Sequence, residues 1–114
     1  MLLLSLATVP SVARGTQIRC PDAQQGSPLA TVTLFDGPPS EHADLEPDNF
    51  HKTRQGTWSE WDVAYIFKAG RQLYVQCQYA QHAASVMLEP GPGTYQCEYV
   101  TEAGGKVSLT CKSR

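Results

Sequence analysis

Two segments near the C-terminal end of the chain alternate hydrophobic and polar residues, as strands with one buried face do. Residues 94–101 read TYQCEYVT, residues 106–111 read KVSLTC, and Ala103-Gly104-Gly105 lies between them. A three-residue loop that ends in glycine suits a type I turn followed by a bulge residue. A hairpin centred on Gly104 sets three pairs opposite each other: Cys97 and Cys111, Tyr99 and Leu109, and Thr101 and Val107. The same register collects one face: Tyr95, Cys97, Tyr99, Val107, Leu109 and Cys111.

The same pattern predicts a second hairpin in the middle of the chain. Residues 61–67 (WDVAYIF) and 71–77 (RQLYVQC) alternate, and Lys68-Ala69-Gly70 again ends in glycine. Centring on Ala69 gives the pairs Trp61 and Cys77, Val63 and Val75, and Tyr65 and Leu73. The apolar face of this hairpin then contains Trp61, Val63, Tyr65, Leu73, Val75, Cys77 and Tyr79.

Two further segments have strand character, and one short segment has helical character. Residues 29–35 (LATVTLF) predict a strand, and so do residues 85–89 (SVMLE), which Pro90-Gly91-Pro92-Gly93 ends. The inward positions are Ala30, Val32, Leu34, Val86 and Leu88. One or two helical turns are expected at residues 40–45. The prediction is a mainly β protein with about six antiparallel strands in a twisted sheet, a small sandwich or a partly closed barrel.

Length and composition limit the classes of protein to which the chain can belong. With 114 residues, 41% of them hydrophobic and 18% charged, the chain is one folded domain rather than a disordered segment. Its net charge of −2 and its nine scattered Lys and Arg residues argue against nucleic-acid binding and against a polybasic membrane patch. No stretch after the N-terminal segment is apolar over ~20 residues, so no membrane span is expected.

The N-terminal segment has features of an export signal. MLLLSLATVPSVARG combines an apolar run with small residues at Ser11 and Ala13, which suits cleavage after Ala13. The segment is short and lacks a basic residue before the apolar run, as a start codon placed too far downstream would explain. An N-terminal strand or buried arm is the structural alternative. We therefore divide the chain into a signal peptide, residues 1–13, and one disulfide-stapled β domain, residues 14–114, which is periplasmic or secreted.

Four cysteines in a small exported chain predict two disulfides. The C-terminal hairpin register pairs Cys97 with Cys111, which leaves Cys20 to pair with Cys77. The second bridge would tie the start of the mature chain to a central strand. A zinc or redox role would require CxxC-type spacing, which is absent.

An acidic stretch follows the strand at residues 29–35. TLFDGPPSEHADLEPDN holds three prolines, five carboxylates and one histidine, and a second histidine follows it. The acidic residues and histidines are Asp36, Glu41, His42, Asp44, Glu46, Asp48 and His51. A calcium loop would need glycine at Asn49 and glutamate at Gln55, and Pro47 separates the two histidines that a zinc site would use. A carboxylate pair could serve acid/base catalysis. The favoured interpretation is a solvated connector in which Asp44 or Asp48 caps nearby backbone, and which can also face a partner.

The two tryptophans raise the possibility of an aromatic contact site. Trp61 falls on the apolar face and is expected in the core, whereas Trp58 precedes the strand and is less constrained. The candidate contact surface is Trp58, Asp36, Glu41 and Asp44. His82, in the loop at residues 80–84, is expected to be exposed to solvent.

Several of these residues carry a family resemblance. Cys20-Pro21, the stretch from Val32 to Pro39, Leu45-Glu46-Pro47-Asp48, Trp61-Asp62 and Leu73–Tyr79 resemble a family of small uncharacterised exported proteins of Gram-negative bacteria. The C-P, F-D-G-P-P, W-D and C-x-Y elements cover most of the chain after Cys20. The resemblance implies export and a cysteine-stapled domain, and it assigns no site residue.

Enzyme signatures such as G-x-S-x-G, a phosphate loop or H-E-x-x-H are missing from the chain. The leading hypothesis is therefore a non-enzymatic binding protein of the bacterial envelope, whose partner is a protein or an envelope glycan. No cofactor, catalytic residue or metal ligand is assigned. Two alternatives remain open, namely a small envelope hydrolase that uses loop carboxylates such as Glu41 and Asp44, and a metal-stabilised structural protein.

Overall fold

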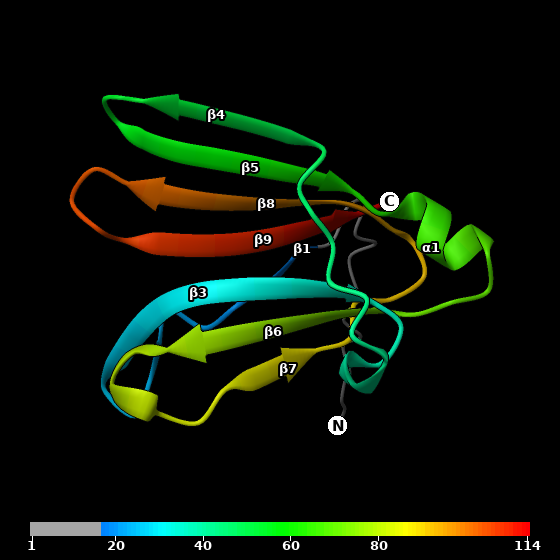
Figure 1. The fold of residues 1–114 in the computed structure, drawn as a ribbon, viewed down its shortest axis with the longest axis horizontal. Coiled ribbons are helices and arrows are strands. Elements are labelled where there is room, and N and C mark those ends of the chain that lie inside the picture. Colours follow the sequence, from blue (N-terminus) through cyan, green and yellow to red (C-terminus); the bar gives the residue numbers. More distant parts are fainter. Residues whose placement is uncertain (1–16) are drawn as a thin grey trace, which may run out of the picture.

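The computed structural model describes residues 17–114, which form two antiparallel sheets (Figure 1). The five-stranded sheet has the order β1-β9-β8-β5-β4. Its strands are β1 (Gln17–Arg19), β9 (Val107–Ser113), β8 (Thr94–Glu102), β5 (Gly56–Asp62) and β4 (Asn49–Thr53). The four-stranded sheet has the order β2-β3-β6-β7. Its strands are β2 (Ala23–Gln24), β3 (Ser27–Asp36), β6 (Leu73–Tyr79) and β7 (Val86–Leu88). The mainly β prediction is confirmed, and the described residues adopt the two-sheet arrangement.

The predicted C-terminal hairpin is confirmed in register from Cys97 to the loop, although its strands run over residues 94–102 and 107–113 instead of 94–101 and 106–111. A bulge between Thr94 and Gln96 interrupts the predicted register at Tyr95. β8 pairs with β9, and the pairs include Cys97 with Cys111, Tyr99 with Leu109 and Thr101 with Val107. Turn chemistry and side-chain alternation specified the same register, which is why two short segments were enough to predict it.

The second predicted hairpin, between residues 61–67 and 71–77, is wrong. β5 ends at Asp62 and pairs with β8, while β6 pairs with β3 and β7. Between β5 and β6 lies a short helix, α1 (Ala64–Lys68), which carries the chain from one sheet to the other. Trp61 therefore lies opposite Cys97 rather than Cys77.

The glycine that suggested a hairpin loop in fact ends helix α1. Gly70 has a φ of 76°, its N–H bonds to the carbonyl of Phe67, and the N–H of Arg71 bonds to the carbonyl of Ile66. This pair of bonds is the Schellman motif of a helix end. Val63, Ile66 and Phe67 also follow helical spacing, and Ile66 is fully buried. Tyr65, expected on the apolar face, is 53% exposed.

The predicted strand at residues 29–35 is confirmed and extended, with one change of face. A bulge between Leu29 and Thr31 shifts the register of β3 against β6. Leu29 is therefore buried and Ala30 is exposed, contrary to expectation, whereas Leu34 is buried as expected. An extra residue in one strand reverses the alternation on one side of the bulge.

Three strands were not predicted, namely β1, β2 and β4. β4 forms a tight hairpin with β5, in which Thr53 pairs with Gly56. Trp58 consequently lies inside a strand instead of before one. The strand at residues 85–89 is confirmed as β7, and the loop before it contains exposed His82, as expected.

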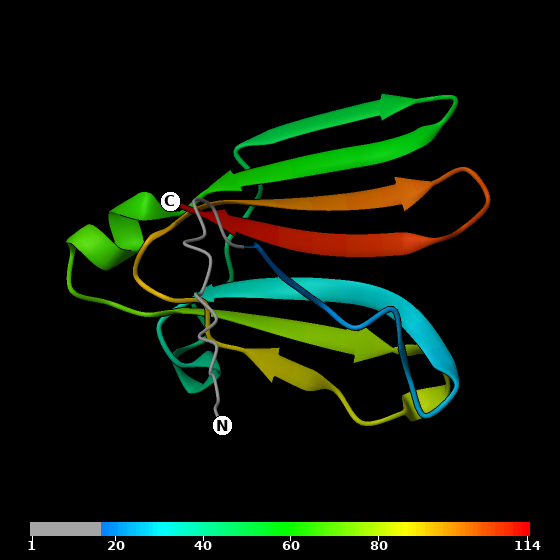
Figure 2. The same cartoon turned by 180° about the vertical axis from the view of Figure 1, so that it is seen from behind.

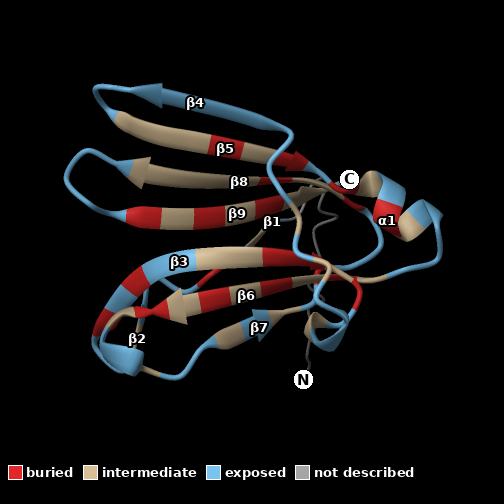
Figure 3. Ribbon diagram, viewed as in Figure 1, coloured by how far each residue is buried: buried red, intermediate tan, exposed pale blue. Residues whose placement is uncertain are grey.

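The core lies between the two sheets and contains both disulfides. Buried residues alternate with half-buried ones along β6 and β9 (Figure 3), and the buried positions belong to the core shared by the two sheets. Both predicted disulfides are confirmed. Cys97–Cys111 joins β8 to β9 within the five-stranded sheet, and Cys20–Cys77 joins the segment after β1 to β6 of the other sheet. All four cysteines are at most 1% exposed.

The segment that contains Cys20 crosses between the sheets on the back of the molecule (Figure 2). It runs from β1 to β2, and a buried tyrosine of β6 holds it. The Tyr79 hydroxyl donates to the carbonyl of Pro21 at 2.7 Å. Burial, followed by the nearby charge of Asp22, raises the pKa of this phenol.

Candidate functional site

The acidic stretch forms the crossover from β3 to β4, which we define as residues 36–48, beginning with the last residue of β3. It leaves the four-stranded sheet, makes the 3-10 turn η1 (Pro39–Glu41) and passes in front of both sheets to reach β4 (Figure 1). The helical turn expected at residues 40–45 is thus present only as a 3-10 turn, which begins at Pro39 and ends at Glu41. The crossover divides into two parts with different electrostatic surroundings.

In the first part, one arginine holds two of the predicted contact residues. Arg71 Nε donates to Asp36 Oδ1 at 2.6 Å, and Arg71 Nη2 donates to Glu41 Oε1 at 2.9 Å and to the Asp36 carbonyl at 3.1 Å. These bonds, that to Asp36 first, raise the pKa of Arg71. We call Asp36, Glu41 and Arg71 the clasp. Its carboxylates are occupied by an internal cation, which is a structural use of charge.

Gly37 lies beneath the clasp and has no room for a side chain. Its φ is 94°, and a Cβ at this position would overlap Arg71 Nη2 and Glu41 Oε1. Its N–H bonds to the carbonyl of Gln72 at 2.9 Å. The left-handed backbone favours glycine here, and the ends of the Arg71 and Glu41 side chains would have to move to admit a Cβ.

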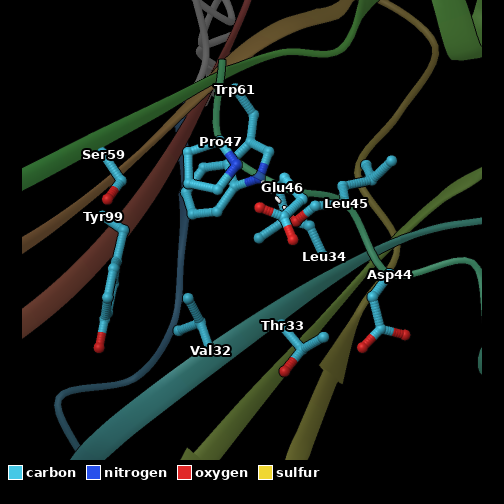
Figure 4. Close-up of a pocket in the computed structure, with 10 residues that line it drawn as sticks. All are labelled: Val32, Thr33, Leu34, Asp44, Leu45, Glu46, Pro47, Ser59, Trp61 and Tyr99. Atoms are coloured by element: carbon cyan, nitrogen blue, oxygen red, sulfur yellow. Dashed lines mark hydrogen bonds between the residues drawn. The ribbon is translucent and has the colours of Figure 1, made fainter. Parts of the chain in front are cut away.

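The second part of the crossover forms one end of a cleft between the two sheets. This cleft has a volume of about 340 Å³ (Figure 4). Residues of β3, β5, β8 and the crossover line it: Val32, Thr33, Leu34, Asp44, Leu45, Glu46, Pro47, Ser59, Trp61 and Tyr99. The lining combines an apolar floor with a few polar groups, which is the usual composition of a recognition pocket.

Three hydrogen bonds hold the crossover against β5 and so fix the cleft, one of which runs from the N–H of Asp48 to the carbonyl of Glu60 at 2.8 Å. The indole Nε1 of Trp61, a side chain 6% exposed, donates to the carbonyl of Leu45 at 3.1 Å. The N–H of Asp62 donates to Asp48 Oδ2 at 2.7 Å. Asp48 thus caps backbone as expected, although the backbone belongs to β5 and not to the crossover. In addition, Asp44 makes a backbone bridge to Phe35.

Three polar side chains of the cleft, those of Asp44, Glu46 and Ser59, have no partner within the part of the chain that the structure describes. Asp44 and Glu46 take part in no ion pair there, unlike Asp36 and Glu41. Ser59 is only 5% exposed, yet its hydroxyl bonds to no described residue and still opens into the cleft. The cleft therefore contains two carboxylates and a hydroxyl that are available to bind another molecule.

A large exposed aromatic residue lies at the rim of the cleft. Phe50 of β4 pairs with Ser59, so the two side chains lie on the same face of the five-stranded sheet. Phe50 is 59% exposed. The whole of β4 is exposed and forms the free edge of its sheet. An exposed aromatic beside a recessed cleft is a common feature of interaction surfaces.

Trp58 lies on the other face of the same sheet. It pairs with His51 of β4 and with Val100 of β8, and its ring centroid lies 5.1 Å from that of His51. Carboxylates on this face are partnered: Glu60 accepts from Asn49 and Gln96, and Glu98 pairs with Lys112. The four predicted contact residues thus occupy three places: Asp36 and Glu41 in the clasp, Asp44 in the cleft, and Trp58 behind it.

Sequence reasoning missed Ser59, Tyr99 and Val32 as cleft residues. Tyr99 and Val32 were assigned to the core, where they are only partly buried. One signal was available: Ser59 is a small polar residue that alternates with Trp61 on an inward face, and such a residue leaves a hollow. Among residues 17–114, no group of three or more His, Cys, Asp and Glu could hold a metal, and no helix is long and apolar enough to cross a membrane.

Comparison with known families now adds to this geometry. The family described as type VI secretion system Tli immunity protein matches residues 23–112, which is most of the chain. This chain belongs to the Tli immunity protein family. The Tli match supports the expectation of a small bacterial family and indicates a non-enzymatic protein that binds a partner protein. No curated protein and no solved structure matches the chain.

Proposed function

We propose that this protein protects its cell by binding and neutralising an effector of the type VI secretion system in the periplasm. The observation that carries the proposal is the match of residues 23–112 to the Tli immunity family. An immunity protein acts by occupying a partner, so it needs a stable recognition surface rather than catalytic groups. The partner class proposed here is a protein, in preference to an envelope glycan.

The architecture supports a binding role. The cleft is rigidly framed, because Trp61 and Asp48 bond the crossover to β5 and the clasp anchors its other end. A surface held in place by its own scaffold loses little conformational entropy when it binds, which favours affinity. Of the two carboxylates that a hydrolase hypothesis would use, Glu41 is bound by Arg71.

The two disulfides support the proposed compartment. Cys20–Cys77 and Cys97–Cys111 fit an oxidising environment, and small exported domains depend on such bridges. The predicted signal peptide at residues 1–13 lies outside the described residues and stays a prediction.

An interbacterial competition experiment tests the proposed function. A strain that lacks this protein is mixed with sister cells that have an active type VI secretion system. We expect its survival to fall, and we expect a plasmid copy that is exported to the periplasm to restore it. Attackers with an inactive secretion system are the control, because they should not kill either strain.

The compartment is tested with a plasmid copy confined to the cytoplasm. We expect this copy to accumulate without restoring survival, because it is separated from the effector and its four cysteines stay reduced. Equal survival of the deleted and wild-type strains against active attackers would contradict the proposed function. Full rescue by the cytoplasmic copy would contradict the compartment alone.

A further inference from the structure

The charges that line the cleft favour a positively charged ligand. Among its ten lining residues, Asp44 and Glu46 carry negative charge and none carries positive charge. Carboxylates elsewhere on the two sheets have internal partners or lie outside the cleft lining: Arg71 holds Asp36 and Glu41, while Glu60 and Glu98 bond to neighbours on the outer face. The cleft is therefore the place where unsatisfied negative charge and a hollow coincide.

Observations independent of the acidic residues point to a bound group. Ser59 is only 5% exposed, and it lines the cleft. Its hydroxyl forms no hydrogen bond to any described residue. No buried polar atom of a described side chain lacks a partner, so the unpaired Ser59 hydroxyl is accessible through the cleft and is available to a ligand. Tyr99, its neighbour on β8, contributes an aromatic ring to the same lining.

Size and chemistry together indicate an arginine side chain. A volume of about 340 Å³ lies at the small end of ligand pockets, so it accepts one large side chain rather than a folded element. A guanidinium carries a positive charge, donates in a planar fork to carboxylates and packs its flat face on aromatic rings. Asp44 and Glu46 can provide the first kind of contact, and Tyr99 and Trp61 the second. Asp44 lies at one end of the cleft and Tyr99 at the other, with Glu46 and Trp61 close together between them (Figure 4).

We propose that the cleft is the specificity pocket of the immunity complex, and that it receives an arginine side chain from a loop of the effector. Asp44 and Glu46 pair with the guanidinium, the Ser59 hydroxyl bonds to it, and Tyr99 packs against its stem. Phe50 covers the adjoining part of the effector loop at the rim. This inference rests on the proposed function for the identity of the partner, but the preference of the cleft for a guanidinium can be measured without the effector.

The first test uses N-acetyl-L-arginine amide as the probe and NMR spectroscopy of the protein as the readout. The chain has two tryptophans, and their indole N–H signals report on opposite faces of one sheet: Trp61 in the cleft and Trp58 behind it. We expect the Trp61 signal to shift with probe concentration and the Trp58 signal to stay. N-acetyl-L-citrulline amide, which has the same shape without the charge, should cause no shift.

Charge-matched variants complete this test. The Asp44→Asn/Glu46→Gln variant should lose the Trp61 response to the arginine probe. The Glu89→Gln/Glu102→Gln variant removes the same number of charges from exposed positions outside the cleft lining, and should keep the Trp61 response. A Trp61 signal that does not move, that moves equally with citrulline, or that moves equally in both variants overturns the inference.

The second test measures affinity for the effector against which the protein protects in the competition experiment. We expect the cleft variant to raise the Kd about tenfold or more, as the loss of charge-assisted hydrogen bonds implies. The Glu89→Gln/Glu102→Gln variant should stay within about twofold. If wild-type protein protects and binds while both variants bind alike, the arginine pocket is wrong and the immunity function stands. If wild-type protein gives no protection, the proposed function fails, and the probe experiment still decides the nature of the cleft.

Discussion

The two parts of the crossover contain similar acidic residues, but their surroundings give these residues different roles. At the clasp, Asp36 and Glu41 share the guanidinium of Arg71, and a glycine makes room for it. At the cleft, a few residues later, Asp44 and Glu46 have no cation among the described residues and face a hollow. The number of acidic residues in a loop therefore says little about function, because only a charge without an internal partner is available to another molecule.

The first prediction concerns the framework that both parts of the crossover share. Replacing Cys20 and Cys77 with alanine should lower the free energy of unfolding by about 4 kcal/mol, because this disulfide closes a loop with a sequence separation of 57. Cys97 and Cys111 close a separation of only 14, so removing their bridge should cost about 3 kcal/mol. Urea denaturation of both variants measures the difference.

Equal losses in the two cysteine variants would contradict the role of loop length. Hydrogen exchange on the variant without Cys20–Cys77 measures whether the clasp and the cleft depend on the same framework. Both parts should loosen together in hydrogen exchange, because β3 and β6 support the start of the crossover and one wall of the cleft.

The second prediction weakens the attachment of the crossover at the cleft. Trp61→Phe removes the N–H that donates to the Leu45 carbonyl and leaves a smaller ring in a buried position. We expect the free energy of unfolding to fall by about 2 kcal/mol, of which about 1 kcal/mol is the hydrogen bond. Trp58→Phe is the matched control on the other face, and its effect should stay within about 0.5 kcal/mol. Similar losses in both variants would show that the Leu45 bond does not hold the crossover.

The third prediction tests the backbone beneath the clasp. Gly37→Ala forces a Cβ into a left-handed conformation and against Arg71 Nη2, so it should cost between about 1 and 2 kcal/mol. Gly104→Ala is the control, because its φ is ordinary and its surroundings are open. Thermal unfolding of both variants measures this, and a Gly37→Ala variant as stable as Gly104→Ala would remove the steric basis of the clasp.

The C-terminal hairpin and the disulfides could be predicted from the sequence. The C-terminal hairpin could be predicted because its strands are adjacent in sequence and its loop type fixes the register. The Cys97–Cys111 bridge followed from that local register, and Cys20–Cys77 followed by exclusion. The mainly β class and the two disulfides therefore needed no knowledge of long-range packing.

The hairpin at residues 61–77 failed because its glycine permits two local structures. Gly70 with positive φ can close a hairpin bulge or end a helix, and alternation over residues 61–67 did not separate these outcomes. The pairing of β5 with β8 and of β6 with β3 decided between them. Tertiary pairing of this kind is not encoded in any short window of sequence.

The candidate site was predictable in location but not in composition. The crossover was recognised as a connector that can face a partner, and Asp44 lies in the cleft. The capture of Asp36 by Arg71 joins residues 35 positions apart, and no sequence pattern announces it. Likewise, the extension of β5 back to Gly56 turned Trp58 to the face opposite Trp61. Only the structure could distinguish the carboxylates that pair with Arg71 from those that have no described partner.

The fourth prediction removes the cation of the clasp. Arg71→Met leaves Asp36 and Glu41 close together without a partner, so the melting temperature should fall, by less than in Gly37→Ala. The groups are largely exposed, and exposed ion pairs contribute little. The loss should shrink at 1 M salt, where the Debye length is about 3 Å. Arg71→Lys keeps the charge but not the planar fork and should lie between wild type and Arg71→Met. A salt-independent loss would assign the stabilisation to packing instead of charge.

The fifth prediction has the smallest effect on stability and compares clasp and cleft directly. Asp36→Asn/Glu41→Gln and Asp44→Asn/Glu46→Gln each neutralise two carboxylates of the same crossover, so the variants have equal net charge. The cleft variant should change the free energy of unfolding by less than about 0.5 kcal/mol, because its carboxylates hold no described partner. It should nevertheless reduce protection in the competition experiment. The clasp variant should lose stability yet protect at saturating expression. Equal behaviour of the two variants in both measurements would mean that internal pairing does not distinguish structural from functional charge in this crossover.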